Sequence, residues 1–135
     1  MSAEENKAVL GQIVEAFNKR ELNVVDEVFA PTFVLHTART PGWPQGLAGA
    51  RQMFTTMLAA APDIQATIED IVAEGDKVAV RWTFRGTHTG ESPLSGGPTG
   101  ERLTAVAIAI YRFVGGKIAE DWGVDARWES GGPWA

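Results

Sequence analysis

Carboxylate and imidazole side chains could move a proton or hold a metal ion, and two carboxylates stand near the end of the chain. Asp121 and Asp125 are carboxylates four residues apart, and the two histidines are His36 and His88. Carboxyl and imidazole groups are common general acids and bases. Cysteine is absent, which excludes disulfides, iron–sulfur clusters and thiolate zinc sites. With two histidines and no second carboxylate at metal-ligand spacing, we expect no bound metal.

Length and charge limit the class of protein. The 135 residues suit one domain over residues 1–135, with neither an internal repeat nor a linker. The net charge is −5 and no run of Lys or Arg occurs, so nucleic acid and anionic membranes are not expected as partners. The first ten residues lack the apolar segment of a signal peptide, and no apolar run approaches the roughly 20 residues that span a bilayer. A cytoplasmic location is the expectation.

The first 60 residues have the periodicity of amphipathic helices. Ser2 and Glu5 have the spacing of a capping box at a helix start. The helix that follows carries an apolar stripe over residues 9–17, a second short helix stops at Pro31, and a third is apolar along one face from Ala50 to Leu58.

The second half has the alternation of β-strands. Strands are predicted over residues 32–37, 64–73, 77–87, 102–114 and 117–125. Gly115-Gly116 between the last two is a strong hairpin signal. Helices first and strands afterwards predict an α+β domain with the helices on one face of the sheet.

One strand is apolar on both faces. Residues 103–111 read LTAVAIAIY, whereas an antiparallel sheet normally leaves one face polar. A second copy of the chain is the simplest cover, so we expect a homodimer through the outer face of the sheet. The alternative is a central strand of small alanines that long neighbouring side chains shield.

Several short motifs occur in a distinctive order along residues 6–125. They are Ala16-Phe17-Asn18, Phe33-Val-Leu-His36, Gly86-Thr-His-Thr-Gly90, Pro98-Thr-Gly100, Tyr111-Arg112, Gly116-Lys117-Ile118 and Glu120-x-Trp122. In this order the chain resembles the SnoaL-like polyketide cyclases (ester cyclases), a branch of the NTF2-like superfamily. The resemblance implies a cone of three N-terminal helices packed on a curved antiparallel or mixed sheet that encloses a pocket.

The resemblance also implies a chemistry. Cyclases of this family need no cofactor and close a ring by intramolecular aldol condensation of a small apolar carbonyl compound, with an acidic residue as general acid and base. A carboxyl in an apolar pocket suits both roles, because desolvation raises its pKa toward neutrality. Apolar walls can also hold a flexible chain in its reactive conformation.

The last strand departs from the family pattern. Members carry a His before its Trp and an Asp after it, whereas this chain has Asp121 and Gly123 there. Asp121, Gly123 and Asp125 share one face of a strand by alternation. We therefore interpret Asp121 as the acid and base, with Asp125 as a second candidate nearer the strand end. The alternative is a chain that has lost its catalytic acid.

The two histidines differ in what they suggest. His36 matches the family's histidine of the first strand, which is expected beside the last strand, where it could orient Asp121 or polarise a carbonyl. A structural His36 bonded to backbone is the alternative. His88 precedes a loop, and we expect a structural or rim role for it.

Bulky apolar residues are expected to line the pocket. The Gly115-Gly116 turn would set Val106 and Ile108 beside Asp121, and Trp43, between Gly and Pro, is a candidate lid. Of the two tryptophans in the tail, Trp128 and Trp134, at least Trp128 is expected to dock on the cavity mouth or across the dimer. The predicted binding residues are Phe17, Trp43, Met53, Phe54, Met57, Trp82, Val106, Ile108 and Asp125.

Two classes of function therefore compete. One is a polyketide-cyclase-type enzyme, and the other is a non-catalytic dimer that binds small apolar molecules. Other reactions of the fold fit less well: Arg81 lacks the partner acids of an epoxide hydrolase, and Tyr111, the only tyrosine, has the opposite parity to Asp121 for a steroid isomerase.

Overall fold

The described part of the chain forms three helices and a five-stranded sheet, in the order that the sequence predicts. The computed structural model describes residues 2–36, 42–91 and 97–128, except for the side chains of residues 125–128. The elements are α1 (Ala3–Asn18), α2 (Val24–Val28), β1 (Phe29–Leu35), α3 (Gly46–Ala60), β2 (Gln65–Glu74), β3 (Lys77–Thr87), β4 (Arg102–Val114) and β5 (Lys117–Trp128).

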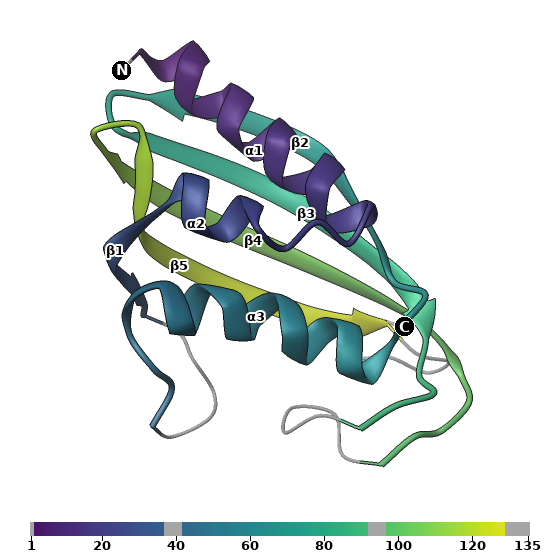
Figure 1. Ribbon diagram of the computed structural model, residues 1–135. Helices are drawn as coiled ribbons and strands as arrows, with labels where there is room; N and C mark the ends of the chain where they lie inside the picture. Colours follow the sequence, from purple (N-terminus) through teal and green to yellow (C-terminus); the bar gives the residue numbers. More distant parts are fainter. Residues whose placement is uncertain (1, 37–41, 92–96, 129–135) are drawn as a thin grey trace.

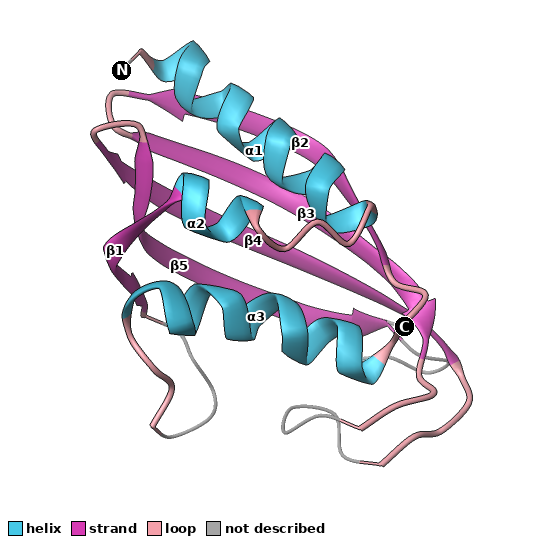
Figure 2. Cartoon of the chain, viewed as in Figure 1, coloured by secondary structure: helices cyan, strands magenta, loops and turns pink. Residues whose placement is uncertain are grey.

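The sheet is mixed, and the helices cover one of its faces. Its strand order is β1-β5-β4-β3-β2, with β1 parallel to β5 and the other pairs antiparallel. Figure 1 shows α1, α2 and α3 lying over the same side of the long, curved strands. Figure 2 shows the separation into a helical layer and a sheet layer. The predicted α+β cone is confirmed.

A local signal explains where α1 begins, whereas β1 starts earlier than the sequence predicts. The capping box is confirmed: Glu5 N donates to Ser2 Oγ at 3.1 Å, and Ser2 N donates to a Glu5 carboxylate oxygen at 3.1 Å. The second helix is shorter than expected and β1 starts earlier, at Phe29 rather than residue 32. Pro31 lies within β1, at the edge of the sheet, where a missing backbone N–H is tolerated.

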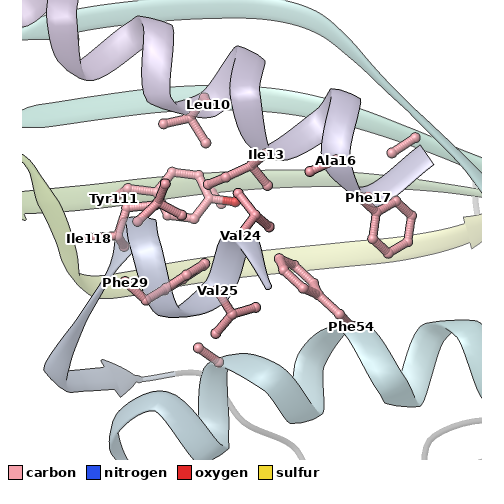
Figure 3. Close-up of a cluster of buried hydrophobic side chains, with 14 of the residues drawn as sticks. Leu10, Ile13, Ala16, Phe17, Val24, Val25, Phe29, Phe54, Tyr111 and Ile118 are labelled. Atoms are coloured by element: carbon pink, nitrogen blue, oxygen red, sulfur yellow. The ribbon is translucent and has the colours of Figure 1, made fainter. Parts of the chain in front are cut away.

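The apolar core lies between the helices and the sheet. Figure 3 shows it as side chains of α1, α2 and α3 meeting those of β1, β4 and β5. Asn18, at the end of α1, fixes this helix to the edge strand: its side-chain amide exchanges hydrogen bonds of 2.9 and 2.8 Å with the backbone of Ala66. The part of the chain that the structure describes contains no helix with the length and apolar character to cross a bilayer.

Candidate active site

A cavity of about 320 Å³ lies between the helices and the inner face of the sheet. Its walls are mostly aromatic, Met and Leu side chains from the helices and β3, and its floor is largely the alanines of β4. Its polar lining side chains are Asp121, Tyr111 and Thr56. The lining residues are Leu10, Ile13, Phe17, Phe29, Leu35, Trp43, Met53, Phe54, Thr56, Met57, Ala60, Ala61, Ile64, Ala66, Trp82, Phe84, Gly86, Leu103, Ala105, Ala107, Ala109, Tyr111, Asp121, Gly123 and Val124.

Asp121 places a carboxyl in this apolar cavity. The residue is 6% exposed, and its Oδ1 is buried with no hydrogen-bond partner among the described residues. Burial away from water raises the pKa of Asp121 to about 7, and the charge of His36 on the neighbouring strand acts weakly in the opposite direction. The carboxyl can therefore be present in both its ionised and its neutral form near neutral pH, as a group that both takes and returns a proton requires.

A β-bulge in β5 sets the face on which each residue of the hairpin lies. Next to the turn, Phe113 pairs with Ile118, but from there the register shifts by one residue, so that Ala119 is extra and Tyr111 pairs with Asp121. A bulge of this kind places two residues of one strand opposite one residue of the other. Tyr111 and Asp121 consequently point to the same side of the sheet, into the cavity.

The prediction of which β4 residues face the cavity was therefore wrong. Val106 and Ile108 lie on the outer face, where Ile108 is 53% exposed, and neither lines the cavity. The prediction assumed an uninterrupted register after the Gly115-Gly116 turn, and a shift of one residue exchanges the faces of a strand. The odd-numbered residues face inward instead: Leu103, Ala105, Ala107, Ala109 and Tyr111.

Tyr111 is a residue of the site that the sequence analysis missed. It is buried, and its hydroxyl oxygen accepts a hydrogen bond of 2.9 Å from Trp82 Nε1. Burial and the nearby Asp121 carboxyl raise the pKa of Tyr111 well above its ordinary value, so the phenol stays protonated. The sequence analysis placed Tyr111 on the opposite face from Asp121, because it assumed an uninterrupted register between β4 and β5. That placement was wrong.

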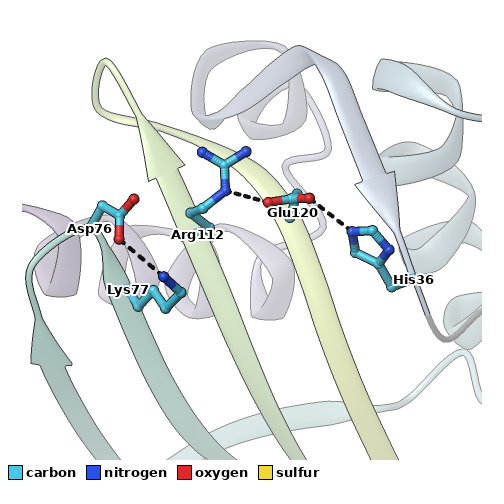
Figure 4. Close-up of polar contacts among 5 residues, drawn as sticks. All are labelled: His36, Asp76, Lys77, Arg112 and Glu120. Atoms are coloured by element: carbon cyan, nitrogen blue, oxygen red, sulfur yellow. Dashed lines mark hydrogen bonds and ion pairs between the residues drawn. The ribbon is translucent and has the colours of Figure 1, made fainter.

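His36 does not face the cavity, contrary to the prediction that it orients Asp121. Its ring stacks on Trp122 with a centroid distance of 4.6 Å, and its Nε2 lies 3.0 Å from Glu120 Oε1. Figure 4 shows Glu120 between His36 and the guanidinium of Arg112. The reason is alternation: Leu35 is the register partner of Asp121 and points inward, so the next residue points outward.

The predicted binding residues of the helices and of β3 do come together. Phe17, Trp43, Met53, Phe54, Met57 and Trp82 all line the cavity. Trp43 covers the start of α3, where its Nε1 donates a hydrogen bond of 3.2 Å to Gly49 O. The side chains of Asp125 and Trp128 lie outside the described part of the chain, and so does the whole of Trp134.

His88 lies outside the lining of the cavity. The ring of His88 is fully buried, is not part of the cavity lining, and has its Nδ1 3.2 Å from Thr99 Oγ1. A structural role for His88 stays a prediction. Across residues 2–36, 42–91 and 97–124, no three side chains of His, Asp or Glu are grouped as ligands for a metal ion.

The chain is similar to proteins of known structure over most of its length. IdmH, a proposed polyketide cyclase from Streptomyces antibioticus, is 32% identical, with 89% of this chain and 91% of IdmH covered and a TM-score of 0.73. AclR, a proposed hydroxylase from Streptomyces galilaeus, is 31% identical, with 92% and 80% covered and a TM-score of 0.75. TsrD from Streptomyces laurentii is 25% identical, with 93% and 90% covered and a TM-score of 0.80.

No curated protein matches the sequence. The sequence model of the SnoaL-like polyketide cyclases, however, matches residues 7–129, which is most of the chain. The chain therefore belongs to the SnoaL-like polyketide cyclase family.

Proposed function

We propose that the protein is a polyketide-cyclase-type enzyme that needs no cofactor and acts on a small apolar carbonyl compound, with Asp121 as its general acid and base. The observation that carries the proposal is the Asp121 carboxyl, buried without a partner for Oδ1 in an apolar cavity. Its ionised form takes a proton from the carbon next to a carbonyl group. The resulting enolate attacks a second carbonyl carbon, and Asp121 returns the proton to the oxygen of that carbonyl, so the carboxyl ends as it began.

The buried carboxyl favours an enzyme over the alternative of a non-catalytic binding protein. A protein that only binds apolar molecules does not need an ionisable group in its cavity. Desolvation makes the ionised form of such a group energetically unfavourable. Titratable groups with strongly shifted pKa values inside a cavity are typical of catalytic sites. The rest of the lining, which is mainly apolar, supports the choice of an apolar ligand.

Exchange of deuterium into 2-tetralone, a bicyclic ketone with acidic hydrogens next to its carbonyl, tests the proposal. The protein in D₂O should speed this exchange, followed by proton NMR, and Asp121→Asn should lower the rate by about 10²–10⁴-fold. Glu120→Gln is the matched control, because it removes the neighbouring carboxylate of the opposite face and should leave the rate unchanged. Equal rates for Asp121→Asn and the wild type would remove Asp121 from the mechanism.

We also propose that two copies associate through the outer face of the sheet. The outer apolar patch consists of Val106, Ile108, Ile110, Trp122 and Val124, of which Val124 is 69% exposed and also borders the cavity. Contiguous apolar surface of this kind is typical of interfaces. Nearby Arg81 is paired with Asp70 and Arg112 with Glu120, so the charges of these two arginines are compensated within each copy.

A further inference from the structure

The hydroxyl group of Tyr111 has a defined direction. Trp82 Nε1 donates to it at 2.9 Å, and an indole N–H can only donate, so the phenol oxygen is the acceptor. The hydroxyl hydrogen must therefore point away from Trp82. Among the residues that the structure describes, the bond from Trp82 is the only hydrogen bond at this oxygen.

Asp121 supplies the second half of the arrangement. It is the register partner of Tyr111, and side chains directly opposite each other in an antiparallel pair have Cβ atoms about 4.5–5.5 Å apart. Its Oδ1 is buried and has no partner in the described part of the chain. A donor and an acceptor without a partner among the described residues thus belong to neighbouring side chains of the same cavity wall, and each is costly to bury until a ligand satisfies it.

A carbonyl group and the carbon next to it match this pair. The carbonyl oxygen accepts a hydrogen bond, and the neighbouring C–H bond carries the proton that a carboxylate can take. We propose that Tyr111 is a catalytic residue whose hydroxyl donates to the substrate carbonyl, and that Trp82 positions it; this inference rests on the function proposed for Asp121.

The step balances with these groups alone. The C–H bond breaks and its proton passes to Asp121, while its electron pair forms the C=C bond of an enolate. The C=O π electrons move onto the oxygen, and the hydrogen bond from Tyr111 stabilises the negative charge there. A donor aimed at an oxygen where charge develops is worth more in a cavity that excludes water. The raised pKa of Tyr111 keeps it a donor throughout the physiological pH range.

A purely structural Tyr111, with its hydroxyl satisfied by Trp82, is the competing account. The infrared absorption of bound 2-tetralone labelled with ¹³C at its carbonyl separates the two, because a hydrogen bond lowers the stretching frequency of that carbonyl. The inference predicts a lowered frequency in the wild type, its loss in Tyr111→Phe and a partial loss in Trp82→Phe. In the same samples, deuterium exchange should be about 10²–10³-fold slower in Tyr111→Phe, with the ketone affinity weakened by only about tenfold at most.

The outcomes distinguish this inference from the proposed function. If exchange depends on Asp121 but Tyr111→Phe keeps the wild-type rate and carbonyl frequency, Tyr111 is structural and the proposed function stands. If the wild type exchanges no faster than Asp121→Asn, the proposed function fails, and the carbonyl frequency alone still decides whether Tyr111 donates to a bound ketone. A ketone that does not bind the wild type overturns the inference together with the proposed ligand class.

Discussion

The carboxyl of Asp121 lies over the backbone of Gly123, two residues further along β5. A Cβ atom at Gly123 would stand 3.3 Å from Asp121 Oδ1 and 3.4 Å from the Cβ of Ala109. The first distance requires the Asp121 carboxyl to give by a few tenths of an ångström, whereas the second is close to ordinary van der Waals contact. The space next to Gly123 is thus part of what lets the Asp121 carboxyl occupy its present position in the cavity.

Gly123→Ala should displace the Asp121 carboxyl slightly. We expect about tenfold slower deuterium exchange into 2-tetralone, because small errors in the position of a catalytic group are costly. The matched control is Gly11→Ala in α1, where an added Cβ meets no atom within 4 Å. That control should raise the free energy of unfolding by up to about 1 kcal/mol and leave the exchange rate unchanged. Full activity in Gly123→Ala would mean that the carboxyl position is not critical.

The buried acid should make the protein less stable as the pH rises. The folded state raises the pKa of Asp121 from 3.8 to about 7, so between these values the folded protein holds a proton that the unfolded chain has lost. The stabilising contribution of the neutral carboxyl is complete below about pH 4, declines up to about pH 7 and amounts to on the order of 4 kcal/mol.

Urea unfolding of the wild type and Asp121→Asn from about pH 4 to pH 8 measures this contribution. The wild type should lose stability relative to the variant as the pH rises. The difference between the wild type and Glu120→Gln should stay nearly constant above about pH 5 and shrink only at lower pH, because hydrogen bonds from Arg112 and His36 lower the pKa of Glu120 below 4.5. A constant difference between wild type and Asp121→Asn across this range would show that Asp121 has an ordinary pKa.

A charge in the outer apolar patch should prevent self-association. Ile108→Lys should convert a dimer into a monomer, as measured by sedimentation velocity, because like charges would meet across a two-fold axis. Since Ile108 is 53% exposed, the folded monomer should tolerate the lysine. Thr55→Lys, on the exposed face of α3, is the control and should remain dimeric. A monomeric wild type would refute the proposed interface.

The sequence predicted the elements well because their signals are local. The capping box at Ser2 and Glu5 and the change of periodicity after residue 62 each depend on neighbouring residues. Asp121 was also found this way, since alternation along one strand is enough to group it with Gly123. The start of β1 at Phe29 was missed because Val25, Val28 and Phe29 fit a helical pattern equally well.

The errors in the site arose from pairings between strands. Nothing in the residues near Ala119 marks the bulge, yet the bulge reverses the face assigned to Val106, Ile108 and Tyr111. His36 was misplaced for a related reason, because its face depends on how β1 aligns with β5. A shift of one residue in the strand register, which tertiary packing sets, thus decides which side chains enter the cavity.

The pH dependence of deuterium exchange into 2-tetralone tests the central claim most directly, because it reports the ionisation of the base itself. The claim predicts that the rate catalysed by the wild type rises with pH to a plateau, with a midpoint near 7, as Asp121 loses its proton. An exchange rate that does not change with pH around 7, or a midpoint near the ordinary Asp pKa of 3.8, would contradict the claim.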